Sequence, residues 1–301
     1  MAAEHELVAQ PLVVTRRKRN AMAILRRKVL PRLIIYILLV LGSVAFILPF
    51  LWMLSSSLKT PGEIFIFPPK WIPSSPQWHN YPDALTIQPF GRYTINTIIV
   101  TGLSMLGTLI SSSLVAYGFA RIRGAGSGFL FSLVLATMML PYQVTMIPTF
   151  IVFRMLGWVN TLKPLIVPSF FGSAFFIFLL RQFMMTVPLE MDEAAIIDGC
   201  STFGVYWRIM LPMAKPALAT VAIFAFMDGW TDLMGPLIYL NSQRLYTIAL
   251  GLATFRQQFS TETPWHQLMA ASIATMIPTL LVFLLAQRIF IQGIVVTGLK
   301  G

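Results

Sequence analysis

The chain has 301 residues, of which 56% are hydrophobic and only 11% are charged, and its formal net charge is +11. A soluble domain uses about 25% charged residues, so this composition excludes an ordinary water-soluble protein and indicates a chain surrounded by membrane lipid. The single cysteine excludes an intrachain disulfide. The three histidines are far apart, and no G-x-x-x-x-G-K-[ST] phosphate loop occurs. We therefore predict no catalytic residue, cofactor or metal site in this chain.

Residues 1–32 form a basic N-terminal segment. Eight of the 22 lysines and arginines lie between Arg16 and Arg32, directly before the first long apolar run. Basic residues beside a membrane helix are typical of its cytoplasmic side. A nucleic-acid surface would need basic residues spread along a folded domain, so nucleic acid is not expected as a partner.

Six apolar stretches follow, each long enough for a helix that crosses the roughly 30 Å hydrocarbon core. They run from about 33 to 54, between Arg92 and Arg121, between Arg123 and Arg154, and over 164–183, 216–240 and 268–290. With both termini in the cytoplasm, 15 lysines and arginines lie inside and 7 outside, which favours this orientation. The prediction is an all-α polytopic membrane protein with six transmembrane helices, N-in and C-in, whose transmembrane domain covers residues 33–301.

Two long outer segments, 55–92 and 241–266, are rich in polar and aromatic residues. Tryptophan and tyrosine are common at the membrane interface. The same residues also suit a docking surface for an external partner, and the sequence leaves both interpretations open.

The segment 187–216 lies between the fourth and fifth predicted helices, on the cytoplasmic side. Pro188 suits the first position of a short helix and Gly199 the position just after it, while Ser201 can cap a second helix that Pro212 ends. Acidic residues lie in the first turns, where the helix dipole favours them: Glu190, Asp192 and Glu193. A connector on the membrane surface is one interpretation. Two short helices joined by a glycine turn favour the other, a rigid docking element.

This segment strongly resembles the EAA loop in the membrane subunits of bacterial ATP-binding-cassette (ABC) importers. That pattern is E-A-A, three residues, G, and about nine residues before I-x-L-P; here it reads Glu193-Ala194-Ala195, Gly199 and Ile209-Met210-Leu211-Pro212. Other stretches resemble carbohydrate-uptake permeases of the maltose and glycerol-phosphate type: PYQVTMIPTF (141–150), FFIFLLRQFMMTVP (175–188), GWTDLMGPLIYL (229–240) and GIVVTGLKG (293–301). The resemblance covers roughly residues 30–301.

Two positions depart from the family pattern. Cys200 stands where the family usually has alanine, which is a change between two small residues. Thr231 stands where the family commonly has asparagine, in W-N-D or W-N-E. Any role of that asparagine is therefore not transferred to this chain.

The resemblance implies a permease subunit in the bacterial inner membrane that is not itself an enzyme. Its implied partners are a second homologous permease, two copies of an ATPase that hold ATP and Mg²⁺, and an extracytoplasmic sugar-binding protein. The helix 190–199 would be the coupling helix that contacts the ATPase. The residues implied in this contact are Glu190, Glu193, Ala194, Ala195, Asp198, Gly199, Leu211 and Pro212, with the C-terminal Leu299, Lys300 and Gly301.

Asp228 and Asp232 lie four residues apart in the fifth predicted span, on one helix face. Acidic residues inside a membrane are candidates for a transport path, and together with Trp230 they form the candidate translocation path. The alternatives are a cap at the kink near Pro236 or a pair with an arginine of the partner permease. The expected cargo is a sugar, with glycerol-3-phosphate or another solute as the alternative. A secondary transporter is disfavoured because no internal repeat is visible.

Overall fold

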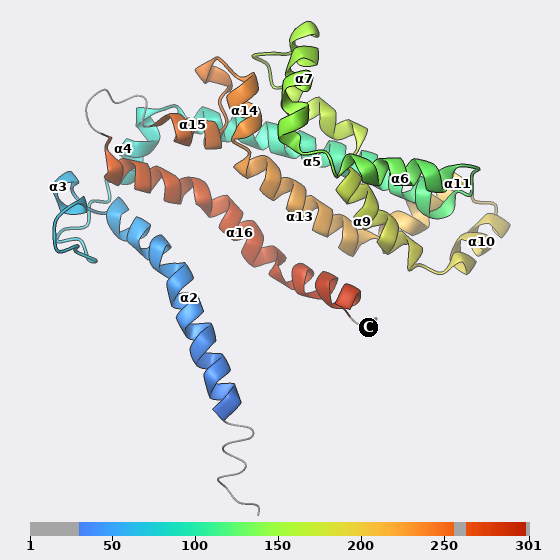
Figure 1. The fold of residues 1–301 in the computed structure, drawn as a ribbon, viewed down its shortest axis with the longest axis horizontal. Coiled ribbons are helices and arrows are strands. Elements are labelled where there is room, and N and C mark those ends of the chain that lie inside the picture. Colours follow the sequence, from blue (N-terminus) through green and yellow to red (C-terminus); the bar gives the residue numbers. More distant parts are fainter. Residues whose placement is uncertain (1–29, 256–262, 299–301) are drawn as a thin grey trace, which may run out of the picture. The chain divides into compact units, whose positions relative to one another are not determined.

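The structure, a computed structural model, describes residues 30–255 and 263–298, with side chains as far as residue 287. Within these ranges the elements are helices without a strand (Figure 1), which confirms the predicted all-α class. Most of the basic N-terminal segment and the C-terminal residues 299–301 lie outside the described residues. The chain divides into two compact units, Met1–Trp52 and Met53–Gly301.

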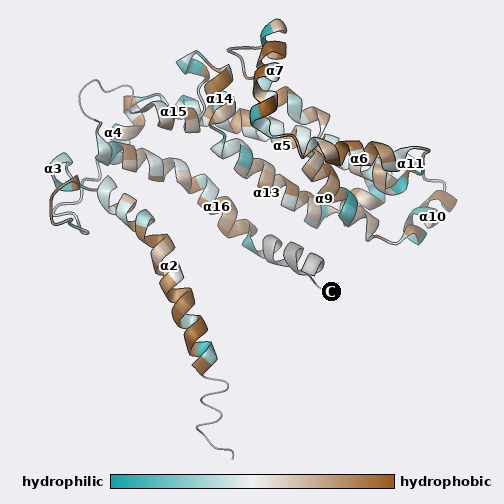
Figure 2. Cartoon of the chain, viewed as in Figure 1, coloured by the Kyte–Doolittle hydropathy of each residue, from teal (hydrophilic) through white to brown (hydrophobic). Residues whose placement is uncertain are grey.

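The described part of the first unit belongs to helix α2 (Leu30–Ser57). Apart from Arg32 and the serines toward its end, its residues are mostly apolar, as the brown colour along much of it shows (Figure 2). A helix that is hydrophobic on all sides is typical of a membrane span. Pro49 lies inside this helix.

The second unit is organised around α5 (Phe90–Arg121), a helix of 32 residues. It packs against α9 (Ala174–Met185), α13 (Lys215–Thr231) and the 3₁₀-helix η2 (Val167–Phe171), and α13 in turn packs against α16 (Trp265–Gly298). Figure 1 shows α9 and α13 beside α5. At a rise of 1.5 Å per residue, α5 is roughly 48 Å long, so it exceeds the hydrocarbon thickness.

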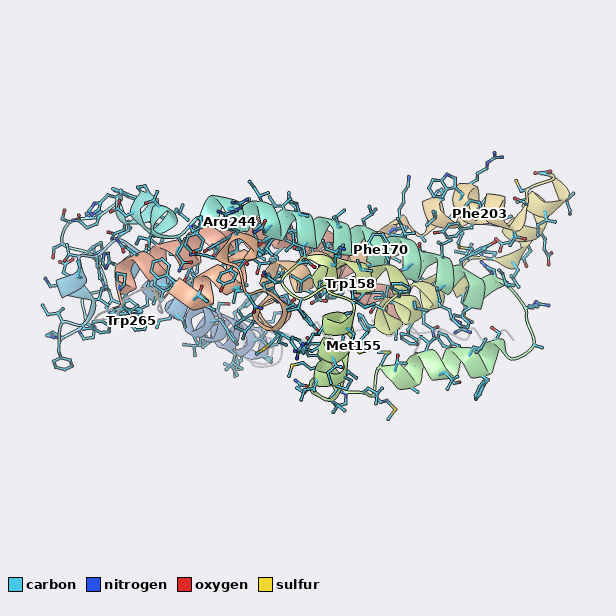
Figure 3. The ribbon with its side chains drawn as sticks, turned by 90° about the horizontal axis from the view of Figure 1, so that it is seen from above. Met155, Trp158, Phe170, Phe203, Arg244 and Trp265 are labelled. Carbon is cyan, nitrogen blue, oxygen red and sulfur yellow. The ribbon has the colours of Figure 1, made fainter. Side chains whose placement is uncertain are left out.

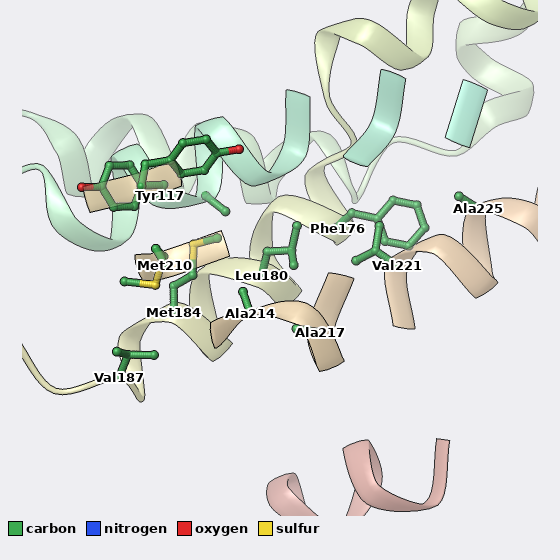
Figure 4. Close-up of a cluster of buried hydrophobic side chains, with 12 residues drawn as sticks. Tyr117, Phe176, Leu180, Met184, Val187, Met210, Ala214, Ala217, Val221 and Ala225 are labelled. Atoms are coloured by element: carbon green, nitrogen blue, oxygen red, sulfur yellow. The ribbon is translucent and has the colours of Figure 1, made fainter. Parts of the chain in front are cut away.

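Two hydrophobic clusters lie toward opposite ends of α5. The first joins the second half of α5 to α9, α13 and the segment before α13, and it includes Tyr117, Leu180, Met184, Met210 and Val221 (Figure 4). The second joins the start of α5 to the end of α13 and the start of α16, and it includes Phe90, Tyr93, Trp230, Phe255 and Ala270. These clusters fix α5 at both ends.

Small polar residues line the seam between α5 and the segment 163–173. The hydroxyls of Ser104 and Ser111 donate to the carbonyls of Leu165 (2.8 Å) and Ser169 (3.0 Å). Between these two serines, Gly107 leaves room for the ring of Phe170. Small residues and interhelical hydrogen bonds are the usual means by which helices approach closely in a membrane.

Four helical stretches are long and apolar enough to cross a membrane, and up to six are available if each of two bent pairs counts as one span. The four are Leu30–Ser57, Phe90–Arg121, Lys163–Met185 and Trp265–Gln287. The first bent pair joins α6 (Ser127–Thr137) to α7 (Tyr142–Met155) at 96°, next to Pro141. The predicted third span is therefore a broken helix.

The predicted fifth span, 216–240, is also not one helix, and this expectation was wrong. Helix α13 ends at Thr231, and α14 (Met234–Tyr239) begins after a break. Asp232 has extended backbone, and its carboxylate accepts the N–H of Gly235 at 3.1 Å. A side chain that bonds to the backbone in this way competes with helix continuation.

The two segments predicted to lie outside the membrane, 55–92 and 241–266, contain short helices in their described parts. Before α5 lie α3 (Pro61–Ile64) and α4 (Asn80–Ile87), and α8 (Lys163–Ile166) precedes η2. After α14 lie the 3₁₀-helix η4 (Gln243–Leu245) and α15 (Ile248–Thr254). The Asn96 amide of α5 donates to the carbonyls of Arg244 (2.9 Å) and Tyr246 (3.0 Å). The described part of the second outer segment is therefore held against α5.

Candidate functional site

The candidate site is the segment between α9 and α13, at the end of the unit where Figure 3 places Phe203, opposite the end with Trp265. Its first helix, α10, runs from Leu189 to Ile197. Pro188 lies at the N-cap with φ −59° and ψ 138°. The proline thus precedes the first helical residue, one position earlier than predicted.

Gly199 ends α10 in the predicted position. Its φ is +87°, a left-handed conformation that glycine adopts without steric cost. The N–H of Cys200 donates to the carbonyl of Ala195 (2.9 Å), and the N–H of Gly199 donates to that of Ile196 (3.0 Å). This pair of bonds is a Schellman motif. The direction in which the chain leaves α10 is therefore fixed by backbone geometry.

One face of α10 is buried and the other is open. Asp192 and Ala195, three residues apart, face the body with 8% and 6% exposure. Glu190, Glu193, Ala194 and Asp198 are exposed. Ala195, which the resemblance implies in the ATPase contact, is therefore not open on this face, because a period of 3.6 residues turns it inward.

The exposed face also carries large apolar side chains. Ile196 and Ile197 are 57% and 84% exposed, and Phe203 and Trp207 beyond the turn are 64% and 63% exposed. The isoleucines supply apolar area next to the exposed Ala194. Large apolar residues that cluster on a surface mark an interaction site.

The second helix of the segment starts at the predicted cap. The hydroxyl of Ser201 accepts the N–H of Gly204 at 3.1 Å, which satisfies a free donor at the start of α11 (Thr202–Val205). The chain continues as the π-helix η3 (Tyr206–Met210) and α12 (Leu211–Met213), then bends by 76° into α13. Helix α12 ends one residue after Pro212. A wide π turn before this proline accommodates a residue that has no N–H to donate.

Three residues on one face of α5 hold this segment. Ser113 hydrogen-bonds to the hydroxyl of Tyr206 (2.8 Å), and the Tyr117 hydroxyl donates to the carbonyl of Thr202 (3.0 Å). Arg121 donates to the carbonyl of Val187 (2.7 Å). The Arg121 Nε also lies 3.1 Å from Asp192 Oδ2, in an ion pair whose side chains are 5% and 11% exposed.

Sequence reasoning missed this attachment. It counted Arg121 only as an inner-side charge and Asp192 only as a helix-dipole residue. The partners lie 71 residues apart, and in a single sequence no spacing rule links them. One signal for a buried Asp192 was available: it lies three residues before Ala195 and therefore shares a helix face with this small apolar residue, while Glu193 points elsewhere.

The candidate path residues lie in different surroundings. Asp228 is exposed, and the next residue, Gly229, meets Thr101 of α5 closely. Trp230 is 6% exposed, and its indole N–H donates to the carbonyl of Thr275 in α16 (3.1 Å). Asp232 caps α14 through Gly235. The structure therefore does not bring the three side chains together in one described pocket.

The first outer segment presents exposed aromatic residues. Phe65, Phe67, Trp71 and Trp78 are 75%, 91%, 49% and 69% exposed. The Asn80 amide fixes the segment by donating to the carbonyls of Ser57 (2.9 Å) and Lys59 (3.0 Å). Among the residues with described side chains, no group of three or more His, Cys, Asp or Glu side chains could hold a metal ion.

Comparison with known proteins places these features in a family. The family model described as "Binding-protein-dependent transport system inner membrane component" matches residues 110–296. The probable ABC transporter permease protein YurM of Bacillus subtilis is 35% identical over 271 residues, which cover 89% of this chain and 88% of YurM. The arabinooligosaccharides transport system permease protein AraQ of Halalkalibacterium halodurans is 35% identical over 212 residues, 70% of this chain and 74% of AraQ. The resemblance seen in the 187–216 segment is thus confirmed.

A solved structure shares the fold. A bacterial ABC transporter involved in the import of the acidic polysaccharide alginate contains a chain that matches with a TM-score of 0.78 at 21% identity. The match covers 86% of this chain and 96% of the solved one. At this identity, the likeness shows the architecture.

Proposed function

The chain belongs to the binding-protein-dependent transport system inner membrane components, and on that premise we propose that it is a permease subunit of an ABC importer for a carbohydrate. Membership in this family supports the transporter role, because the chain covers 88% of a relative that is named an ABC transporter permease. A relative named for arabinooligosaccharide transport supports a sugar cargo. Members of the family are membrane components, so this chain is the non-catalytic subunit of the transporter complex.

The proposed topology has six spans with both termini in the cytoplasm. The bent pair α6 and α7 supplies one of them and α13 supplies another, and the lysine and arginine bias supports the orientation. The 187–216 loop then lies on the cytoplasmic side. Bends at Pro141 and Ala214 suit helices that surround a gated path better than straight rods do.

In this proposal α10 is the coupling helix, and it inserts into a cleft of an ATPase subunit. The observation that supports this role is a rigid, protruding helix with an open face of Glu190, Glu193, Ala194 and Ile197 that ends in a Schellman motif. Closure of two ATPase subunits around ATP and Mg²⁺ would displace α10 and switch the spans from inward-facing to outward-facing. The C-terminal Leu299, Lys300 and Gly301 are proposed as a further ATPase contact.

The remaining proposed partners are a second homologous permease in the membrane and an external sugar-binding protein that delivers the cargo. For the path itself we favour Asp228, because an exposed carboxylate in a membrane span needs water, a partner or substrate beside it. Asp228→Asn is expected to lower uptake, and unchanged uptake in that variant removes it from the path. Thr231→Ala, one helical turn further on, is the matched control.

Co-purification tests the proposed function. When this chain is affinity-tagged and isolated from its native membrane, it is expected to bring an ATPase and a second permease with it, and the complex is expected to hydrolyse ATP. Transport by this chain alone in liposomes would instead indicate a secondary transporter. A thermal-shift screen of the binding protein against sugars and glycerol-3-phosphate then identifies the cargo class.

A further inference from the structure

The coupling loop is attached to the end of α5 at several successive points. Ser113, Tyr117 and Arg121 are spaced by four residues, so they share one face of α5. Each contacts a different part of the loop: Tyr206 in η3, Thr202 at the start of α11, and Val187 with Asp192 at the start of α10. One stripe of a single helix thus holds the entrance, the middle and the second helix of the loop.

The ion pair among these contacts is shielded from water. Arg121 and Asp192 have side-chain exposures of only 5% and 11%, so water screens their attraction weakly. Arg121 also holds the Val187 carbonyl, in the turn that links α9 to α10. A residue of α5 therefore holds the turn that connects α9 to α10.

The other end of α5 is attached to the outer segments in the same manner. Asn96 holds the carbonyls of Arg244 and Tyr246, and the hydroxyl of Thr97 accepts the N–H of Ile248 at 2.8 Å. A single continuous helix of 32 residues therefore links the cytoplasmic loop to the outer surface. A rigid element with fixed contacts at both ends can transmit a displacement.

We infer that Arg121 is a positioning residue that joins α10 to α5, so that α10 and α5 move as one body when the ATPase subunits bind ATP. This inference rests on the proposed function and adds which span receives the movement. Under this inference α5, rather than the adjoining α9 and α13, is the helix that receives the movement of α10 directly. The segment 163–173 then follows α5 through the packed seam at Ser104, Gly107 and Ser111, and α9 and α13 follow through their own packing against α5.

Spin-label distances in the purified complex test this inference. Labels are placed at Met191→Cys on α10 and Ile95→Cys on the outer half of α5, two positions with 40% and 59% exposure, in a Cys200→Ala background. The distance is measured without nucleotide and with ATP, Mg²⁺ and vanadate. We expect one narrow distance that ATP leaves unchanged. A shift on ATP addition in the otherwise unaltered protein overturns the inference, because α10 would then move relative to α5.

The variant Arg121→Met is expected to add a second, shifted distance population when ATP is present. Arg123→Met, which removes the exposed arginine two residues later, is the matched control and should retain one distance. An Arg121→Met complex that behaves like this control also overturns the inference.

Arg121→Met leaves Asp192 buried without its partner and can prevent assembly. The double variant Arg121→Met/Asp192→Leu removes both charges, and Tyr117→Phe removes only the hydroxyl that holds Thr202. These two variants should assemble and show the same second population, weaker in Tyr117→Phe. ATP hydrolysis by the complex is recorded separately. Its absence contradicts the proposed function, while the nucleotide-free distances still test the attachment.

Discussion

Gly107 of α5 lies directly against the ring of Phe170 in η2. A Cβ atom on Gly107 would lie 2.6 Å from the ring atom Cδ2 and 2.6 Å from the hydroxyl of Ser169. Both distances are well below van der Waals contact. The ring cannot retreat freely, because Ser111 holds the backbone before it at Ser169 and Ser112 holds the backbone after it at Ser173. Glycine at 107 is therefore required by the close approach of two helical segments.

We predict that Gly107→Ala destabilises the protein by about 1–3 kcal/mol, the usual cost of an added group in a packed seam. The measurement is the apparent Tm of the purified complex, with its yield after membrane extraction. Gly102→Ala is the control in the same helix, because a Cβ there meets nothing within 4 Å. Equal Tm values for the two variants would contradict the proposed seam.

A second prediction concerns Gly199. A Cβ at this position meets nothing within 4 Å, so a substitution is opposed by the φ of +87° and not by neighbouring atoms. The left-handed conformation costs an ordinary residue about 1–2 kcal/mol, less for asparagine and more for β-branched residues. Substrate uptake and ATPase binding should therefore decrease in the order Gly199→Asn, Gly199→Ala, Gly199→Val. Membrane insertion should be unaffected in all three. Normal uptake in Gly199→Val would remove the turn from the coupling mechanism.

Asn160 gives a third prediction, in which glycine is the milder replacement. Asn160 has φ of 60°. Its side chain accepts the N–H groups of Asn241 (3.1 Å) and Ser242 (2.8 Å) and donates to the hydroxyl of Ser242 (2.8 Å). Asn160→Gly loses these bonds without backbone strain, whereas Asn160→Ala loses them and adds about 1–2 kcal/mol of strain. Limited proteolysis within 240–247 should be faster in Asn160→Ala. The reverse order would contradict the assignment.

The fourth prediction is a pH dependence in the first outer segment. Hydrogen bonding with Ser74 is the main reason that the pKa of Glu63 lies below its usual range; the Ser74 N–H lies 3.3 Å from the carboxylate. For an acid whose pKa is lowered by folding, the stabilisation is present at neutral pH and is lost as the pH falls through the lowered value. Hydroxyl-radical labelling of Trp71 should therefore rise only at strongly acidic pH. In Glu63→Gln it should be higher at neutral pH and show no such step.

Much of the architecture was predictable from the sequence because lipid imposes length and hydropathy on every span. Local rules also predicted the turn at Gly199 and the cap at Ser201, since both depend on residues within three positions. The break near Ala214 agrees with the predicted end of the second loop helix at Pro212. A cap at the kink near Pro236 was one of the alternatives left open, but hydropathy alone does not place the break after Thr231. The inward face of Ala195 required the position of α5, which a local pattern does not contain.

The candidate path residues also differ in how far the local sequence predicts their surroundings. The spacing of Asp228 and Asp232 predicts one shared helix face, but that prediction assumes a helix that continues through both residues. Asp232 instead ends the helical stretch and caps the next one. Trp230 resembles a path residue by type, yet its N–H and ring contact Thr275 and Phe226. Only packing between distant segments distinguishes these surroundings.

The Schellman turn of α10 places the protein's only cysteine where it is experimentally useful. Cys200 is partly exposed and lies three residues from Ile197. One thiol-reactive fluorophore therefore labels the unmutated chain at a single site on the loop. Its emission, or its protection from labelling, becomes a built-in optical reporter of whether the loop is occupied, and it needs no engineered residue.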